Sequence, residues 1–169
     1  MDDLAESDNT FQIEENSKLS NTELIELAVR YHKEGNISEA SKYYQLFIDA
    51  GFTNPLVFSN YGLICQQTNQ IDKAIELYKK SINKFPGSPE AYSNLGNIMR
   101  NLGKLNQAEI LQKKAIEINP EYFQAYFNLS VIYIDSQRFN EAEICQNQVL
   151  KLQPDLPEAY FCLGNILRH

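Results

Sequence analysis

The fold is decided by residues 89–122, PEAYSNLGNIMRNLGKLNQAEILQKKAIEINPEY. In the first half of this stretch, apolar or small residues recur at the spacing i, i+3, i+4 and i+7: Tyr92, Leu95, Gly96 and Met99. That spacing places all four side chains on one face of a helix. A second stripe begins at Ala108, after Gly103, and Pro120 ends it. The stretch therefore predicts two helices joined by a tight turn.

The same pattern returns along the chain at an offset of 34 residues. At the first position of the apolar stripe, successive units carry Leu24, Phe58, Tyr92, Tyr126 and Tyr160. The small position reads Ala28, Gly62, Gly96, Ser130 and Gly164, and a later alanine column reads Ala40, Ala74, Ala108 and Ala142. No insertion or deletion interrupts the alignment, which predicts four units, 21–54, 55–88, 89–122 and 123–156, and a partial fifth unit, 157–169.

The aligned columns have physical reasons. A small residue in the first helix and an alanine in the second allow the two helices to approach closely. The turn between them needs a residue that adopts a positive φ, which ends the first helix. The residues at this place are Gly35, Asn69, Gly103 and Gln137.

Helix starts are also marked. Asn54-Pro55 and Ser88-Pro89 each predict an N-cap followed by a proline at the first helical position. Residues 20–23, SNTE, have the spacing of a capping box. These signals place the start of each first helix at the start of a unit.

The pattern resembles the tetratricopeptide repeat, most plainly in the segment PEAY at 89–92 and in Leu95, Gly96, Gly103, Ala108, Ala115 and Pro120. The resemblance covers residues 21–169. It implies an all-α fold, a right-handed superhelical solenoid of helix-turn-helix units, with the first helices on the concave face and the second helices outside. It also implies a scaffold that binds a protein or peptide.

Charge is unevenly distributed. Six of the 22 acidic residues, against one of the 15 basic residues, lie within residues 1–20. We predict this segment to be disordered; the alternative is that it docks on the array or on a partner. The remainder is nearly neutral and has no basic stripe, which argues against nucleic acid as a partner. No apolar run approaches a membrane span, and three scattered cysteines favour a cytoplasmic location.

The sequence offers no catalytic site. It contains no phosphate-binding loop, no nucleophile elbow and no metal-ligand spacing. The two histidines, His32 and His169, stand at opposite ends of the chain, so neither is expected to pair with a nucleophile. We therefore expect no enzymatic activity, no cofactor and no metal.

A row of asparagines marks the expected concave face. Two residues past the aligned aromatic, three successive units carry Asn60, Asn94 and Asn128; five residues past it, two units carry Asn97 and Asn165. An asparagine amide both donates and accepts, so it can pair with the backbone of an extended peptide. The row resembles the asparagine ladder in the repeat region of O-linked N-acetylglucosamine transferases. The alternative is that these side chains are simply solvated.

Three further residues complete the predicted groove. Arg100 is expected to hold an acidic side chain of a peptide, although a carboxylate clamp is not expected because no lysine stands at the matching positions. Phe127 and Phe161 occupy equivalent sites in adjacent units. They either form an apolar shelf beside the asparagine row or pack against the neighbouring unit.

The sequence thus predicts a peptide-binding scaffold. An alternative is the substrate-recruiting repeat region of a larger, glycosyltransferase-type enzyme, of which this chain is a fragment. The last helix keeps the repeat pattern at Tyr160, Leu163 and Leu167 instead of turning polar. This favours a fragment over a capped array, and it also leaves self-association through the last helix open.

Overall fold

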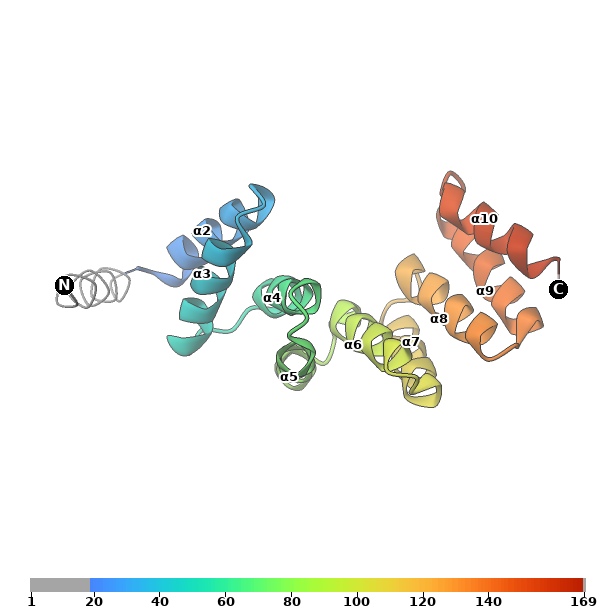
Figure 1. Cartoon of the computed structure of the whole chain (residues 1–169), viewed down its shortest axis with the longest axis horizontal. Coiled ribbons are helices and arrows are strands. Elements are labelled where there is room, and N and C mark those ends of the chain that lie inside the picture. Colours follow the sequence, from blue (N-terminus) through green and yellow to red (C-terminus); the bar gives the residue numbers. More distant parts are fainter. Residues whose placement is uncertain (1–18, 169) are drawn as a thin grey trace.

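The computed structural model describes residues 19–168, and this part of the chain is entirely helical (Figure 1). Its helices are α2 (Asn21–Lys33), α3 (Ile37–Asp49), α4 (Pro55–Gln67), α5 (Ile71–Lys84), α6 (Pro89–Asn101), α7 (Leu105–Ile118), α8 (Phe123–Asp135), α9 (Phe139–Leu152) and α10 (Pro157–Ile166). The predicted all-α fold of helix-turn-helix units is confirmed. The predicted acidic segment, apart from Leu19 and Ser20, lies outside the described residues.

Consecutive helices pack as pairs, and the pairs stack in chain order. Helix α2 contacts α3, α4 contacts α5, α6 contacts α7, and α8 contacts α9, while α5–α6, α7–α8 and α9–α10 contacts join one pair to the next. Figure 1 shows the pairs following one another along the long axis, from α2 at one end to α10 at the other. Such a stack buries its core between neighbours rather than around one centre.

The four turns within the units share one geometry. The turn residues Gly35, Asn69, Gly103 and Gln137 have φ values of 75°, 59°, 72° and 57°. The next residue in each turn donates its backbone N–H to the last residue of the apolar stripe, as Lys104 does to the Met99 carbonyl at 2.9 Å. This bond satisfies a carbonyl that the ending helix leaves unpaired. The sequence prediction of a positive φ at all four turns is confirmed.

The helix starts follow the prediction with one exception. Ser20 and Glu23 form the reciprocal capping box, and the Asn54 side chain accepts from the Leu56 N–H at 2.8 Å. Ser88 stands at the N-cap of α6, but its hydroxyl donates to the Glu90 carboxylate at 2.7 Å and makes no capping bond to the backbone. Pro89 at the first helical position has no N–H, so this position leaves no donor unpaired.

Sixteen residues after each small residue of a first helix, the second helix carries a fully buried side chain. These buried residues are Tyr44, Tyr78, Gln112 and Gln146. A Cβ added at Gly62 would come within 2.6 Å of the Tyr78 ring, and one at Gly96 within 2.7 Å of the Gln112 amide nitrogen. The close approach of the two helices therefore depends on these glycines.

On the last helix, α10, the face that carries the small residue Gly164 has no second helix packed against it within the described residues. A Cβ added at Gly164 would meet nothing within 4 Å, and Tyr160 and Leu167 are 56% and 63% exposed. Leu163 is partly buried. Self-association through this helix stays a prediction. Within residues 19–168, no helix is long and apolar enough to cross a membrane.

We predict that Gly62→Ala destabilises the array by about 1–3 kcal/mol, because its methyl group would overlap the buried Tyr78 ring. Gly164→Ala is the matched control, since its methyl group enters open space and alanine favours a helix over glycine. Urea unfolding followed by circular dichroism compares the two. Equal urea midpoints for the two variants would show that the close approach of the two helices at Gly62 does not limit stability.

We also predict opposite effects for two turn substitutions. Gln137→Gly should stabilise the protein by about 0.5–1 kcal/mol, because glycine adopts the positive φ of 57° without steric cost. Gly103→Ala should destabilise it by about 1 kcal/mol, since its φ of 72° strains any residue with a Cβ. Thermal unfolding measures the stability of both variants. A change in stability of the same sign in the two variants would contradict the requirement for a positive φ at the turn.

Candidate functional site

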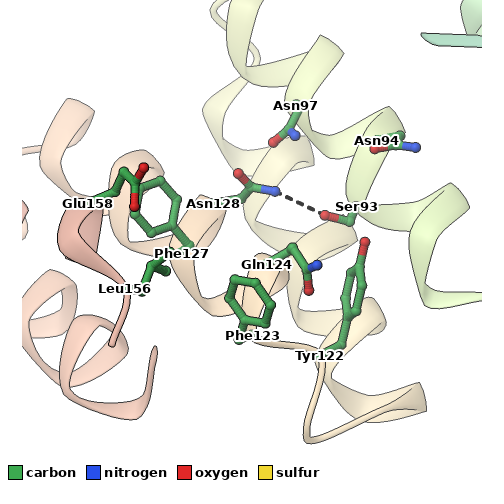
Figure 2. A pocket seen from close by; sticks show the side chains of 10 residues that line it. All are labelled: Ser93, Asn94, Asn97, Tyr122, Phe123, Gln124, Phe127, Asn128, Leu156 and Glu158. Atoms are coloured by element: carbon green, nitrogen blue, oxygen red, sulfur yellow. Dashed lines mark hydrogen bonds between the residues drawn. The ribbon is translucent and has the colours of Figure 1, made fainter. Parts of the chain in front are cut away.

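Two adjoining cavities lie on the face formed by the first helices. The first, of about 360 Å³, is lined by Ser93, Asn94, Asn97, Tyr122, Phe123, Gln124, Phe127, Asn128, Leu156 and Glu158 (Figure 2). The second, of about 860 Å³, is lined by Pro55, Leu56, Ser59, Asn60, Leu63, Phe85, Gly87, Ser88, Pro89, Glu90, Asn94 and Tyr122. Because Asn94 and Tyr122 line both, the cavities are contiguous. We call the two together the groove.

Most of the predicted asparagines line this groove. Asn94, Asn97 and Asn128 line the first cavity, and Asn60 and Asn94 line the second. In Figure 2 the amides of Asn94, Asn97 and Asn128 lie along one side of the first cavity, with the rings of Phe123 and Tyr122 on the other. The groove therefore combines polar groups that can pair with a peptide backbone and apolar surface that can receive side chains.

Three of these asparagines are held by hydrogen bonds within the fold. Asn60 donates to the Tyr44 hydroxyl at 3.1 Å, and Asn128 donates to the Ser93 hydroxyl at 3.0 Å (Figure 2). Asn97 accepts from the Gln112 amide at 3.2 Å. Each of the three amides keeps at least one polar atom for a ligand.

Asn94 differs from the other asparagines of the row. Within residues 19–168 its side chain has no hydrogen-bond partner, although it lines both cavities. Its carbonyl and its amino group are both available at the junction of the two cavities. Replacing the Asn94 side chain would therefore change the groove without breaking a hydrogen bond within the described residues.

Arg100 forms an ion pair within the fold. Its guanidinium bonds to the Asp135 carboxylate at 2.6 Å, which joins α6 to α8, and it lines neither cavity. The expectation that Arg100 holds an acidic side chain of a peptide stays a prediction; in this structure its carboxylate partner comes from the next repeat unit.

Two other predicted residues also lie outside the groove. Phe127 lines the first cavity, whereas Phe161 is 73% exposed and lines neither, so the two do not form one shelf within the groove. Asn165 lines neither cavity and accepts a hydrogen bond from Arg168.

Sequence reasoning missed three columns of the repeat. The first helical position supplies Pro55, Pro89 and Phe123 to the groove, and two further columns flank it. The N-cap column supplies Ser88, Tyr122 and Leu156 to the groove, and the second helical position supplies Leu56, Glu90, Gln124 and Glu158. Burial raises the pKa of Tyr122, and the nearby Glu90 carboxylate acts in the same direction. The 34-residue offset contained the signal for all three columns, because every member stands at an equivalent place in its unit.

The described residues offer no activated nucleophile among the thiols and no metal site. Burial raises the pKa of Cys145 to about 11 and also raises the pKa values of Cys65 and Cys162. A thiol with a raised pKa stays protonated at neutral pH and is a poor nucleophile. Within residues 19–168, no three His, Cys, Asp or Glu side chains come together as metal ligands.

Solved structures share this fold. The crystal structure of MamA superposes with a TM-score of 0.75 at 22% identity, covering 88% of this chain and 81% of MamA. YrrB, described as a TPR protein with an unusual peptide-binding site, gives 0.71 at 20% identity, covering 84% and 73%. The first TPR of Spaghetti (RPAP3), solved with the HSP90 peptide SRMEEVD, gives 0.64 at 27% identity, covering 68% and 90%.

A curated relative matches a shorter stretch. The uncharacterized protein YgeG of Escherichia coli (strain K12) is 36% identical over 59 residues, which are 35% of this chain and 36% of YgeG. The chain thus spans about a third of the length of that relative.

The repeat family is recognised in three stretches of the sequence. Residues 62–103 match the family described as TPR repeat, and residues 89–122 and 123–156 each match the tetratricopeptide repeat. These stretches run without a gap from residue 62 to residue 156, which is more than half of the chain. The protein therefore belongs to the tetratricopeptide-repeat family.

Proposed function

We propose that this protein is a binding scaffold that holds an extended peptide segment of a partner protein in the groove. The observation that carries the proposal is the row of Asn60, Asn94 and Asn128 along two contiguous cavities. The cavities have apolar walls, and the asparagines come from three successive first helices. An extended chain that crosses these helices would meet one amide per repeat unit.

The hydrogen bonds within the fold support this proposal. A peptide backbone alternates donors and acceptors, and an asparagine amide supplies both. Asn60, Asn97 and Asn128 are already held by Tyr44, Gln112 and Ser93. A side chain that is ordered before binding loses less conformational entropy when the ligand arrives, so the groove is preorganised for binding.

The similar proteins support the same class of function. Among them, the RPAP3 repeat domain was solved with a bound peptide, and YrrB is described by its peptide-binding site. The RPAP3 peptide, SRMEEVD, has three acidic residues at or near its end. Within residues 19–168 no lysine or arginine lines either cavity, so the proposed ligand is not an acidic tail.

The row of asparagines also supports the similarity to the ladder of O-linked N-acetylglucosamine transferases. The similarity is limited to three units, because Glu26 and Cys162 occupy the equivalent sites at the two ends. A ladder of this length favours recognition of a short backbone segment, with specificity supplied by the apolar cavities.

We predict that Asn94→Ala weakens peptide binding roughly five- to thirtyfold, because it removes both polar groups from the junction of the cavities. The probe is an array of N-acetylated, C-amidated dodecapeptides of varied sequence, and the tightest binders are then measured by fluorescence polarisation. Helicity should not change, since the Asn94 side chain makes no hydrogen bond within residues 19–168.

The matched control is Asn101→Ala. Asn101 lies on the same helix but is exposed and lines neither cavity, so the substitution should leave the affinity unchanged. The proposal fails if the two variants bind the peptides with equal affinity, or if the unaltered protein binds none of them.

A further inference from the structure

The first helices that form the groove carry almost no charge. Helices α4, α6, α8 and α10 contain only four charged residues: Glu90, Arg100, Asp135 and Glu158. Arg100 and Asp135 neutralise each other in their ion pair. Two carboxylates, Glu90 and Glu158, therefore remain without a compensating cation on this face.

Both remaining carboxylates line the groove. Glu158 lines the first cavity, where Figure 2 places it beside Phe127, and Glu90 lines the second. Each stands at the second position of its helix, directly after a proline. Glu90 accepts a bond from the Ser88 hydroxyl, and within residues 19–168 neither carboxylate has a cationic partner. Each cavity thus carries one uncompensated negative charge.

Other charges do not offset these two. The positive end of a helix amounts to about half an elementary charge, whereas each glutamate carries a full one. Every lysine and arginine within residues 19–168 lies outside the residues that line the two cavities. Residues 21–169 carry 16 acidic and 14 basic residues, so the repeat array has no net positive charge that would offset the two glutamates.

We propose that the occupant of the groove is a basic and apolar peptide, with a lysine or arginine beside each glutamate and apolar side chains in the two cavities. The inference rests on the proposed peptide-binding function and adds the chemistry of the ligand. Phe123, Phe127 and Leu156 supply apolar surface in the first cavity, and Leu56 and Leu63 supply it in the second. The asparagine row pairs with the peptide backbone, while Glu90 and Glu158 select for positive charge.

The test uses three matched sets of N-acetylated, C-amidated nonapeptides. All have the same two apolar residues, one Phe and one Leu, at varied spacing, and their flanking positions are all Lys, all Gln or all Glu. The Lys set should bind roughly three- to tenfold more tightly than the Gln set, and the Glu set more weakly than either. The advantage should shrink between 0.05 M and 0.5 M NaCl, because both carboxylates are exposed.

Paired variants identify the source of the preference. The double variant Glu90→Gln and Glu158→Gln should lose the preference, so that the Lys and Gln sets bind it with equal affinity. The control, Asp72→Asn and Glu143→Gln, removes the same amount of charge from residues that line neither cavity and should keep the preference.

The outcomes distinguish failure of the charge preference from failure of the proposed peptide-binding function. Equal binding of the Lys and Gln sets, tighter binding of the Glu set, or a preference that survives in the groove double variant would overturn the inference and leave the peptide-binding function standing. If no nonapeptide of any set binds, the proposed function fails, and the charge preference fails with it.

Discussion

The close contact between a small residue of each first helix and a large buried residue of its second helix is the constraint on which the array depends. Gly62 lies against Tyr78 and Gly96 against Gln112, at separations that leave no room for a methyl group. Gln146 donates to the Ser130 hydroxyl at 2.7 Å, Ala28 and Tyr44 stand at the equivalent places in the first unit, and all four residues are fully buried. Because the pairing repeats every 34 residues, each unit has the same internal geometry. Stacking such units brings equivalent positions of the first helices to one side.

The same buried residues connect the core to the groove. Tyr44 accepts a hydrogen bond from Asn60, and Gln112 donates both to Asn97 and to the Ser93 carbonyl, while Ser93 in turn accepts from Asn128. The side chains that hold the helices together therefore also fix the amides that face a ligand. A change in packing inside the core is expected to alter the groove, because these hydrogen bonds join the two directly.

The 34-residue repeat predicted the features that the backbone determines. It did not predict the contacts that depend on side-chain conformation. The helices, the positive φ at Gln137 and the position of Asn94 all follow from the repeat, because the backbone fixes which face a residue occupies. The ion pair of Arg100 with Asp135 did not follow, since it joins neighbouring units and depends on side-chain conformation. Phe161 is exposed although it is equivalent to Phe127, because no unit follows it within the described residues. Tyr122 and Glu158 did not follow either, because the equivalent positions in the other units carry unlike side chains, Asn54, Ser88 and Leu156 for the first and Leu56, Glu90 and Gln124 for the second.

The central claim is that the asparagine amides of the first helices contact the ligand. The most direct measurement is a titration of ¹⁵N-labelled protein with the tightest peptide of the dodecapeptide array, followed through the side-chain amide signals of asparagine. The account predicts shifts at Asn60, Asn94, Asn97 and Asn128 and unchanged signals at Asn101 and at Asn147, which is exposed on a second helix. Shifts confined to the second helices, or unchanged signals along the asparagine row, would contradict it.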